Sequence, residues 1–468
     1  MSLAVCDSSL QARGCDSIIL SNLMSIYQKL RSNLRNDPLL QRVVRNSSYL
    51  FSSSAVSAVL SAGQMIFVVR LLDPDGYGLA TGIIMVFASN VNRFLSFRMS
   101  EVVVRYAGEA LTHEKRDRAA ALIKGIGIIE AITSIVAYLV LIALSSWAAT
   151  VLAKDVSTTP LFIFYGLFLL ANLVYETSVG MLQTLNQFGR VARANFYQSI
   201  VTFLLIIAIS LWLPNIFGVL LAYLAGKTIA GLIVTVSAFR EVNRTLGSEW
   251  MRVPLRHVSD WKPVGRFMLS TNLNGTINLF ARDNIPIYIG YFLSTTEVGY
   301  FKFALTLINL VMLPIEPFIW PTYAEITRTI AQRQWDATRK LLKQVSSIAG
   351  VWTLLTGGGL IALGWWIIPL VFGAKFAPSY PAIVILLVGY GCANIFNWNR
   401  PLLLALGHPR YPLFVAGIVG AVEVALIFLL VPYGNYLTAS AIFSGYLAIS
   451  ILWMVLRGLA FIRRAEAS

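Results

Sequence analysis

Long apolar blocks separated by short polar segments dominate the pattern of this chain. A bilayer core about 30 Å thick requires roughly 20 mainly apolar residues in each spanning helix. On that criterion the pattern predicts twelve transmembrane helices, and therefore an all-α polytopic membrane protein. Their expected ranges are 47–71, 79–100, 125–146, 161–183, 194–213, 216–239, 267–292, 298–323, 344–372, 381–405, 411–431 and 437–456.

The first 45 residues differ from the rest, because charges are scattered through them and no apolar run leads to a small-residue cleavage site. We therefore do not expect a secretory signal peptide. Ile18–Tyr27 could form an amphipathic surface helix or belong to a partly ordered tail. The whole pattern predicts a cytoplasmic tail at 1–45, a six-helix bundle at 46–240, a basic cytoplasmic linker at 241–266, a second six-helix bundle at 267–460 and a cytoplasmic tail at 461–468.

The composition agrees with a membrane protein. The 468 residues are 57% hydrophobic and only 13% charged, with a mean hydropathy of +0.70, whereas soluble domains are about 25% charged. The net charge is +15, from 37 Lys and Arg against 22 Asp and Glu. With the N-terminus inside, 28 of these basic residues fall in cytoplasmic segments, 2 in outer loops and 7 in spans. This asymmetry predicts that both termini are cytoplasmic, and it makes the charge an orientation signal and not a sign of nucleic-acid binding.

Candidate catalytic chemistry is sparse. The three histidines lie far apart on predicted cytoplasmic segments, so we expect no zinc site. Gly226-Lys-Thr228 resembles the end of a phosphate-binding loop, but Leu221 stands where the first glycine belongs, so ATP-driven transport is not expected. The predicted outer segments are too short for a catalytic domain. We therefore expect neither an enzyme nor a cofactor or metal.

The two halves resemble each other at one fixed offset along the chain. Leu72-x5-Gly78 matches Leu293-x5-Gly299, and Leu185-Asn-Gln-Phe-Gly189 matches Leu406-Gly-His-Pro-Arg410 more weakly at the same offset. Each pair occupies the same place in its half, a short turn beside a helix end. Because six spans are an even number, both halves enter the membrane from the same side. The duplication predicts two bundles related by a pseudo-twofold axis along the membrane normal, with a cavity between them; shared membrane composition is the alternative source of the matches.

Ionisable residues within the spans are the main functional candidates, because such residues usually face a bundle interior or an aqueous cavity. Arg93 and Arg98 are five residues apart and point in different directions on a helix, and Arg98 could snorkel to lipid headgroups. The basic set is Arg93, Arg98, Lys227, Arg282, Lys302 and Arg400, with Arg70 at the outer edge of the first span. The acidic set is Glu130, Glu176, Asp283, Glu316 and Glu423.

The seventh and tenth spans are unusually polar. Asn274, Asn278 and Arg282 are spaced four apart, so a continuous helix would place all three on one face. Amides and guanidinium groups suit sugar hydroxyls and phosphate oxygens; a structural polar network between helices is the alternative. The residues expected to line a cationic or polar lumen are Arg93, Arg98, Asn274, Asn278, Arg282, Lys302, Asn399 and Arg400.

Three short motifs, in this order and with twelve helices in two halves, resemble the polysaccharide flippases of O-antigen and exopolysaccharide synthesis. They are Arg70-Leu-Leu-x5-Gly-Leu-Ala80 after the first helix, Val104-Arg-Tyr-Ala107 after the second and a small Asn/Gly turn after the fourth. The similarity covers roughly residues 45–460 and identifies the chain as a member of the multidrug/oligosaccharidyl-lipid/polysaccharide exporter superfamily. The tail departs from the pattern, since such proteins often begin close to the first helix.

The resemblance implies that the chain moves a polyprenyl-diphosphate-linked oligosaccharide from the inner to the outer leaflet of the cytoplasmic membrane, for surface polysaccharides such as exopolysaccharide or lipopolysaccharide. It also implies a cationic lumen, and as partners the lipid bilayer, a polysaccharide polymerase and the export machinery. We expect alternating access, in which a diphosphate is attracted to the lumen while the polyprenyl tail stays in lipid. A membrane potential that is negative inside would assist an anion moving outward.

Two questions stay open at this level. Glu130, Glu176, Asp283 and Glu423 are candidates for an ion-coupling site, although each could instead pair with a nearby base. The function could also be that of a multidrug or cation antiporter of the same superfamily, for which an acidic and aromatic lumen is expected. A polytopic polysaccharide polymerase is a further alternative, but those proteins generally have a large outer loop, which the predicted topology lacks.

Overall fold

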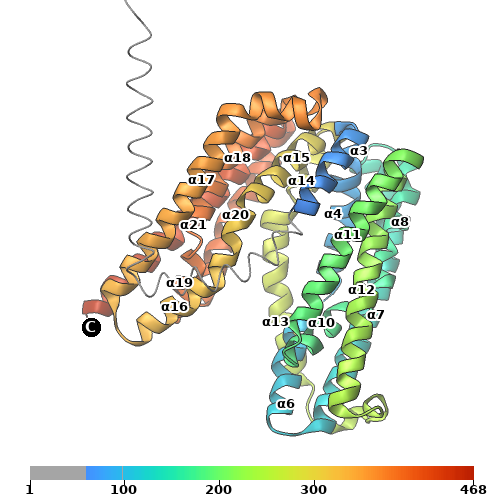
Figure 1. The fold of residues 1–468 in the computed structure, drawn as a ribbon, viewed down its shortest axis with the longest axis vertical. Helices are drawn as coiled ribbons and strands as arrows, with labels where there is room; N and C mark the ends of the chain where they lie inside the picture. The colour runs from blue at the N-terminus through green and yellow to red at the C-terminus, as the bar shows by residue number, and fades with distance from the viewer. Residues whose placement is uncertain (1–58, 97, 468) are drawn as a thin grey trace, which may run out of the picture.

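The computed structural model describes residues 59–96 and 98–467, and the regular structure of this part is helical, with no strand in it (Figure 1). Nine helices in the described residues are long and apolar enough to cross a membrane, or ten if one bent pair counts as a single span. The predicted all-α multi-pass fold is confirmed, and a total of twelve spans is consistent with it but stays a prediction. The predicted tail at 1–45 and the start of the first span lie outside the described residues.

The first half of the chain contains the helices of the first predicted bundle. Its elements are an apolar helix at Val59–Leu71, α3 (Pro74–Tyr77), the π-helical η1 (Gly78–Ile84), α4 (Met85–Leu95), α5 (Met99–Val102), the π-helical η2 (Val103–Ala107), α6 (Gly108–Thr112), α7 (Arg116–Val151), η3 (Val156–Thr158), α8 (Thr159–Gly166), α9 (Phe168–Ala171), α10 (Tyr175–Thr184), α11 (Phe188–Trp212) and α12 (Ile216–Leu246). Three predicted spans, 125–146, 194–213 and 216–239, correspond to the single helices α7, α11 and α12.

The second half follows two short 3-10 turns, η4 (Trp250–Arg252) and η5 (Leu255–His257), in the predicted linker. Its elements are α13 (Lys262–Asn278), the π-helical η6 (Leu279–Asp283), α14 (Ile285–Phe292), α15 (Thr295–Met312), η7 (Leu313–Phe318), α16 (Ile319–Ala331), α17 (Trp335–Phe372), η8 (Ala374–Ser379), α18 (Tyr380–Ile395), α19 (Asn399–Ala405), α20 (Arg410–Leu430), η9 (Val431–Tyr433) and α21 (Tyr436–Ala467). The eighth predicted span is bent by 47° between α15 and α16, where Pro314 cannot donate a backbone hydrogen bond.

The seventh span changes its helical type at Leu279. Between Asn278 and Arg282 the α-helix gives way to the π-helical turn η6, which has a wider hydrogen-bonding pattern than an α-helix. The seventh span is thus not one continuous α-helix, and a shared face for Asn274, Asn278 and Arg282 stays a prediction. The side chains of Asn274 and Asn278 lie outside the described part of the structure.

The two bundles approach each other at one end and diverge toward the other (Figure 1). The divergent end holds α6 and the linker, and is the predicted cytoplasmic end. The seventh span joins the bundles, because Val264 and Met268 of α13 belong to a buried cluster of the first bundle with Met99, whereas Ala281 of η6 packs against Gly420 of the second. The seventh span therefore passes from one bundle to the other.

Basic side chains connect the bundles at the predicted outer end. Lys154, which follows α7, donates to the backbone oxygen of Tyr291 (2.8 Å), and Lys375 of η8 pairs with Asp73 (2.5 Å). These two lysines are separated by the same offset as the matched motifs of the duplication. Arg70 donates two further hydrogen bonds to the backbone at the end of α17. The structure is therefore closed at this end.

The paired turns of the two halves also share their backbone conformation. Asn186 (φ 56°) and Gly407 (φ 79°) both lie in the left-handed region, and the duplication places them at equivalent positions. Asparagine and glycine are the residues that adopt this conformation most readily. The weaker of the two sequence matches thus marks equivalent turns, which agrees with a fold built from two related bundles.

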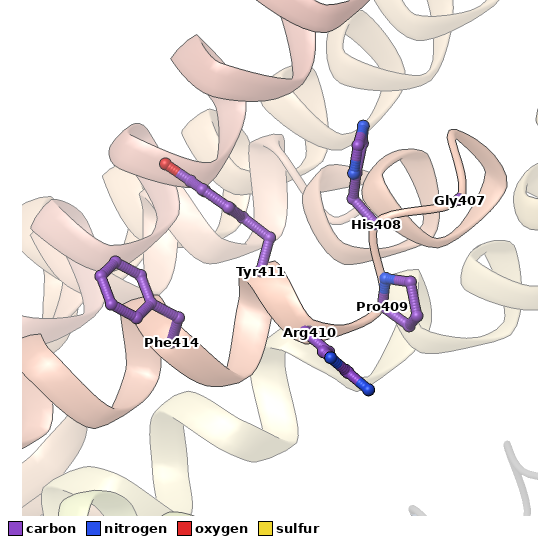
Figure 2. Close-up of a pocket in the computed structure, with 6 residues that line it drawn as sticks. All are labelled: Gly407, His408, Pro409, Arg410, Tyr411 and Phe414. Atoms are coloured by element: carbon purple, nitrogen blue, oxygen red, sulfur yellow. The ribbon is translucent and has the colours of Figure 1, made fainter.

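A pocket of about 420 Å³ adjoins the turn at Gly407 (Figure 2). The ring of His408 stacks on Phe461 at 4.1 Å between centroids, and the indole of Trp453 donates to the Tyr411 hydroxyl (3.0 Å). The lining residues are Gly407, His408, Pro409, Arg410, Tyr411 and Phe414. None of them belongs to the set predicted for the lumen, so the pocket is a feature of the turn between α19 and α20.

Candidate functional site

Polar side chains of α4 and of the seventh span meet where the two bundles face each other. Arg93 of α4 forms an ion pair with Asp283 of η6, and Asn90 hydrogen-bonds Asn284 one residue further along. Although both lie in predicted spans, the side chains of Arg93 and Asp283 are 59% and 36% exposed. Charged groups in spans face aqueous space or partners and not lipid. These residues therefore form a polar contact between α4 and the seventh span.

Asp283 interacts with two more bases of the second bundle. The negative charge of Asp283 interacts electrostatically with both Arg282 and Lys302. The side chain of Arg282 also forms a hydrogen bond with that of Tyr390 on α18. We call Arg93, Arg282, Asp283 and Lys302 the Asp283 cluster. Three bases and one carboxylate have a combined charge of +2. An unbalanced charge in a region of low dielectric attracts a counter-ion, so the cluster is suited to bind an anion.

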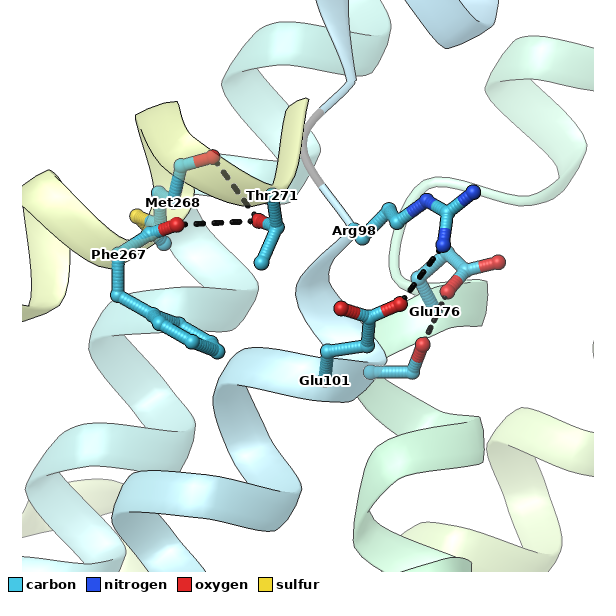
Figure 3. A network of polar contacts seen from close by, with 7 residues as sticks. Arg98, Glu101, Glu176, Phe267, Met268 and Thr271 are labelled. Atoms are coloured by element: carbon cyan, nitrogen blue, oxygen red, sulfur yellow. Dashed lines mark hydrogen bonds and ion pairs between the residues drawn. The ribbon is translucent and has the colours of Figure 1, made fainter. Parts of the chain in front are cut away.

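Arg98, the second arginine predicted to line the lumen near α4, lies in a separate polar network (Figure 3). Arg98 precedes α5 and pairs with Glu101 on the next turn (2.8 Å), while Ser100 donates to the carboxylate of Glu176 on α10 (2.5 Å). The helix is interrupted between α4 and α5 at Ser96 and Arg98, so these side chains belong to a different segment from Arg93. The structure thus does not bring Arg98 into the Asp283 cluster.

Glu130 of α7 is engaged by the backbone of another helix. The fourth span is interrupted after α9, and α10 begins at Tyr175. The two oxygens of the Glu130 carboxylate, which is only 2% exposed, accept the backbone N–H groups of Glu176 and Thr177, both at 2.8 Å. The first N–H groups of a helix have no partner within the helix, and here a side chain from α7 supplies it. Glu130 therefore caps α10.

Glu423 of α20 is a buried acid whose carboxylate has no hydrogen-bond partner in the described part of the chain. It is 2% exposed, and this lack of a partner holds for both carboxylate oxygens. Tyr288 and Tyr446 are its electrostatic neighbours. A buried carboxyl group without a partner is costly unless it takes up a proton or a cation. No group of three His, Cys, Asp or Glu in the described part could hold a metal ion.

The remaining predicted residues lie at the interruption of the tenth span. Asn399 is buried and donates to the backbone oxygen of Phe396 (2.7 Å), so its amide stabilises the turn between α18 and α19. Arg400, the second residue of α19, is exposed. Glu176 is the second residue of α10, after the corresponding interruption of the fourth span. Each of these charged residues is thus the second residue of the helix that follows the interruption in its bundle.

Three residues of the site were not selected from the sequence. Asn90 lies three residues before Arg93, a helical spacing that would have revealed it, and Asn284 directly follows Asp283. Tyr390 lies in an apolar stretch of α18, and nothing in the sequence pattern distinguishes it from other aromatic residues of the spans. Only its contact with Arg282 reveals its role.

The long apolar helices of this fold are those of a multi-pass membrane protein. Residues 67–381 match the family described as polysaccharide biosynthesis protein, and the chain belongs to this family. It is 24% identical over 354 residues to the inner membrane protein YghQ of Escherichia coli (strain K12), a match that covers 74% of this chain and 97% of that protein.

Solved structures share the fold. An inward-facing multidrug resistance MATE family transporter of the MOP superfamily matches with a TM-score of 0.71 at 13% identity, covering 88% of this chain and 96% of the other. The lipid II flippase MurJ, in an inward closed conformation, matches with a TM-score of 0.68 at 15% identity, covering 90% of each chain. The chain is therefore a member of the polysaccharide biosynthesis protein family that has the fold of these MOP-superfamily and flippase structures.

Proposed function

We propose that the protein translocates a polyprenyl-diphosphate-linked oligosaccharide from the inner to the outer leaflet of the cytoplasmic membrane, for the synthesis of surface polysaccharide. The Asp283 cluster is the observation that supports this cargo. A diphosphate esterified at both ends carries about two negative charges, and the cluster has a charge of +2. Arginine and lysine donors bind phosphate oxygens through charge-assisted hydrogen bonds.

The mechanism that we propose is alternating access. The bundles diverge toward the predicted cytoplasmic end (Figure 1), so the cargo enters there from the inner leaflet while its polyprenyl tail stays in lipid. The diphosphate then competes with Asp283 for Arg93. Because the Arg93–Asp283 pair joins α4 to the seventh span, its loss weakens one connection between the bundles. Cargo binding thereby favours a different arrangement of the bundles, as a ligand with unequal affinity for two states must.

Ion coupling, in this proposal, belongs to Glu423. The other three candidate acids are engaged: Glu130 by backbone N–H groups, Glu176 by Ser100 and Asp283 by Arg93. Glu423 alone among these four has both oxygens without a partner in the described part. It can therefore exchange a proton or bind a cation during the transport cycle without first breaking another contact.

The location and partners follow from the same proposal. The relative YghQ is named an inner membrane protein, and we place this chain in the corresponding membrane. The distribution of basic residues predicts that the N- and C-termini lie in the cytoplasm. A polysaccharide polymerase and export machinery would use the cargo that reaches the outer leaflet.

The competing function is export of organic cations, and the similarity to a MATE transporter favours it. The excess of positive charge in the Asp283 cluster opposes it, because a cation would be repelled there. The two functions predict different phenotypes. An exporter would raise the resistance of expressing cells to lipophilic cations in a manner that depends on its acidic residues, such as Glu176.

Translocation in vesicles tests the proposal directly. The full chain is reconstituted with a synthetic polyprenyl-diphosphate disaccharide, and the fraction of sugar reaching the opposite leaflet is measured with a membrane-impermeant reagent. We expect Arg282→Ala to reduce the rate about tenfold or more, because a charged hydrogen bond contributes about 1.5–3 kcal/mol, and Arg282→Lys to retain more activity. Arg463→Ala, at an exposed site on α21, is the control. Absence of translocation above protein-free vesicles, together with cation resistance in cells, would overturn the proposal.

A further inference from the structure

A second basic site lies inside the first bundle. Lys227 of α12 is half-buried, and its ammonium lies 4.4 Å from the ring centroid of Phe168 and 5.6 Å from that of Tyr165. No carboxylate within the described ranges forms an ion pair with it. A cation–π contact contributes about 0.5–2 kcal/mol, which offsets only part of the cost of holding a charge within a span.

Hydroxyl groups accompany this lysine. Tyr165 is completely buried, and its hydroxyl has no hydrogen-bond partner among the described residues. Tyr223 lies one helical turn before Lys227 on the same face of α12 and is an electrostatic neighbour of Tyr165. Buried polar groups normally have partners. An ammonium without a carboxylate and a hydroxyl without an acceptor would both be satisfied by one anion.

The position of this site relates it to the cargo. Lys227 is close enough to Arg93 for their charges to interact, so it adjoins the Asp283 cluster on the side of the first bundle. The cluster already balances the charge of a diphosphate, and Lys227 adds one further positive charge. A neutral glycan would leave that charge unbalanced, whereas a glycan with an acidic group would neutralise it.

We propose that Lys227, with the hydroxyls of Tyr165 and Tyr223, forms a subsite for the carboxylate of an acidic sugar, so that the cargo is an acidic oligosaccharide. This inference rests on the proposed function and adds the chemical class of the glycan. The diphosphate binds the Asp283 cluster between the bundles, and the acidic sugar lies toward the interior of the first bundle. Lys227 is therefore a residue that determines specificity and not the general affinity for lipid-linked cargo.

A matched pair of substrates tests the assignment. Two synthetic polyprenyl-diphosphate disaccharides are used that differ only in a terminal glucuronate or its uncharged methyl ester, and their translocation by the reconstituted full chain is compared. We expect the intact protein to prefer the acid about tenfold, because truncating one partner of a close charge pair costs at least that much. Lys227→Gln should remove the preference and leave transport of the ester within about twofold. Lys227→Arg, which keeps the charge, should restore much of the preference.

Control variants distinguish a loss of substrate preference from a loss of folding. Lys343→Gln removes an exposed lysine of α17 and should leave the preference intact. If Lys227→Gln elutes as aggregate, Lys227→Met takes its place, because an apolar side chain of similar length is well tolerated where a charge was buried. The proposed subsite is overturned if a folded Lys227 variant loses translocation of the acid and the ester equally. It is also overturned if that variant keeps the preference for the acid. Failure of the intact protein to move either substrate instead contradicts the proposed function itself.

Discussion

Gly78 and Gly299 lie against each other where the first bundle meets α15 of the second. A Cβ atom added to Gly78 would collide with the backbone oxygen of Thr295, and one added to Gly299 would collide with that of Pro74. The contact is reciprocal under the duplication, because Pro74 corresponds to Thr295 as Gly78 does to Gly299. When residue i of one half contacts residue j of the other and j of the first contacts i of the second, the two halves are related by a twofold axis. The pseudo-twofold axis therefore passes close to this contact.

We expect Gly78→Ala to weaken the outer contact, because the obstacle is backbone and not a flexible side chain. Overpacking of this kind costs about 1–3 kcal/mol, so the midpoint of thermal unfolding in detergent should fall. Gly417→Ala is a matched control within α20, where an added Cβ meets nothing within 4 Å, and it should not lower the midpoint. Equal midpoints for the two variants would contradict the close approach.

A crosslink between positions 73 and 375 should stop transport. Asp73 and Lys375 join the bundles at the predicted outer end, so a short thiol-specific crosslinker between Asp73→Cys and Lys375→Cys would hold that end closed. The chain's own cysteines, Cys6, Cys15 and Cys392, are replaced by serine first. Translocation should be lost on crosslinking and recover when a cleavable linker is cut. Full activity of the crosslinked protein would exclude opening at this end.

Removing the charge of Asp283 should tighten cargo binding and slow its release. In Asp283→Asn the cluster has a charge of +3, and Arg93 no longer has a competing carboxylate. We expect the Kd for a diphosphate lipid to fall several-fold while the translocation rate also falls, because the rate then depends on release. Arg93→Gln should act in the opposite direction on binding. Weaker binding by Asp283→Asn would argue against a role of the cluster in holding phosphate.

Glu130→Ala should destabilise the first bundle. The substitution leaves two N–H groups of α10 without an acceptor, and each unsatisfied buried group costs about 1–3 kcal/mol. Glu130→Gln keeps one acceptor oxygen and should be less harmful. For comparison, Glu101→Ala removes only an exposed ion pair with Arg98, which contributes about 0–1 kcal/mol. Thermal unfolding of the three variants in detergent would rank them, and an equal effect of Glu130→Ala and Glu101→Ala would disprove the cap.

Glu423→Gln should abolish the coupling of translocation to an ion gradient and leave the folding of the protein unchanged. Glutamine has the shape of a protonated glutamate but cannot exchange a proton or balance a cation. We expect the variant to unfold at a similar temperature and to translocate cargo at a rate that no longer responds to an imposed proton or sodium gradient. The intact protein should respond to one of these gradients. A response that survives the substitution would assign coupling to another group.

The helical spans could be predicted from local sequence, because a stretch of about twenty consecutive apolar residues usually forms a helix that crosses the bilayer. The predicted span at 194–213 lies within α11 (Phe188–Trp212), apart from one residue at its end. The interruptions of the fourth and tenth spans left no such signal, because both segments still have the length and hydropathy of a continuous span. The polar partners at these breaks come from far along the chain: Glu130 accepts the first N–H groups of α10 after Asn172–Val174, and the indole of Trp398 donates to Ser346.

The sequence by itself determined the class of protein, its orientation signal in the basic residues, and the duplication, since all three depend on composition or on spacing along the chain. Only the tertiary structure decided which charges act together. Arg93 and Asp283 are 190 residues apart and meet across two bundles, whereas Arg93 and Arg98 are neighbours in sequence and belong to different networks. Charge interactions depend on distance in space, and that distance is set by the packing of helices far apart in the chain.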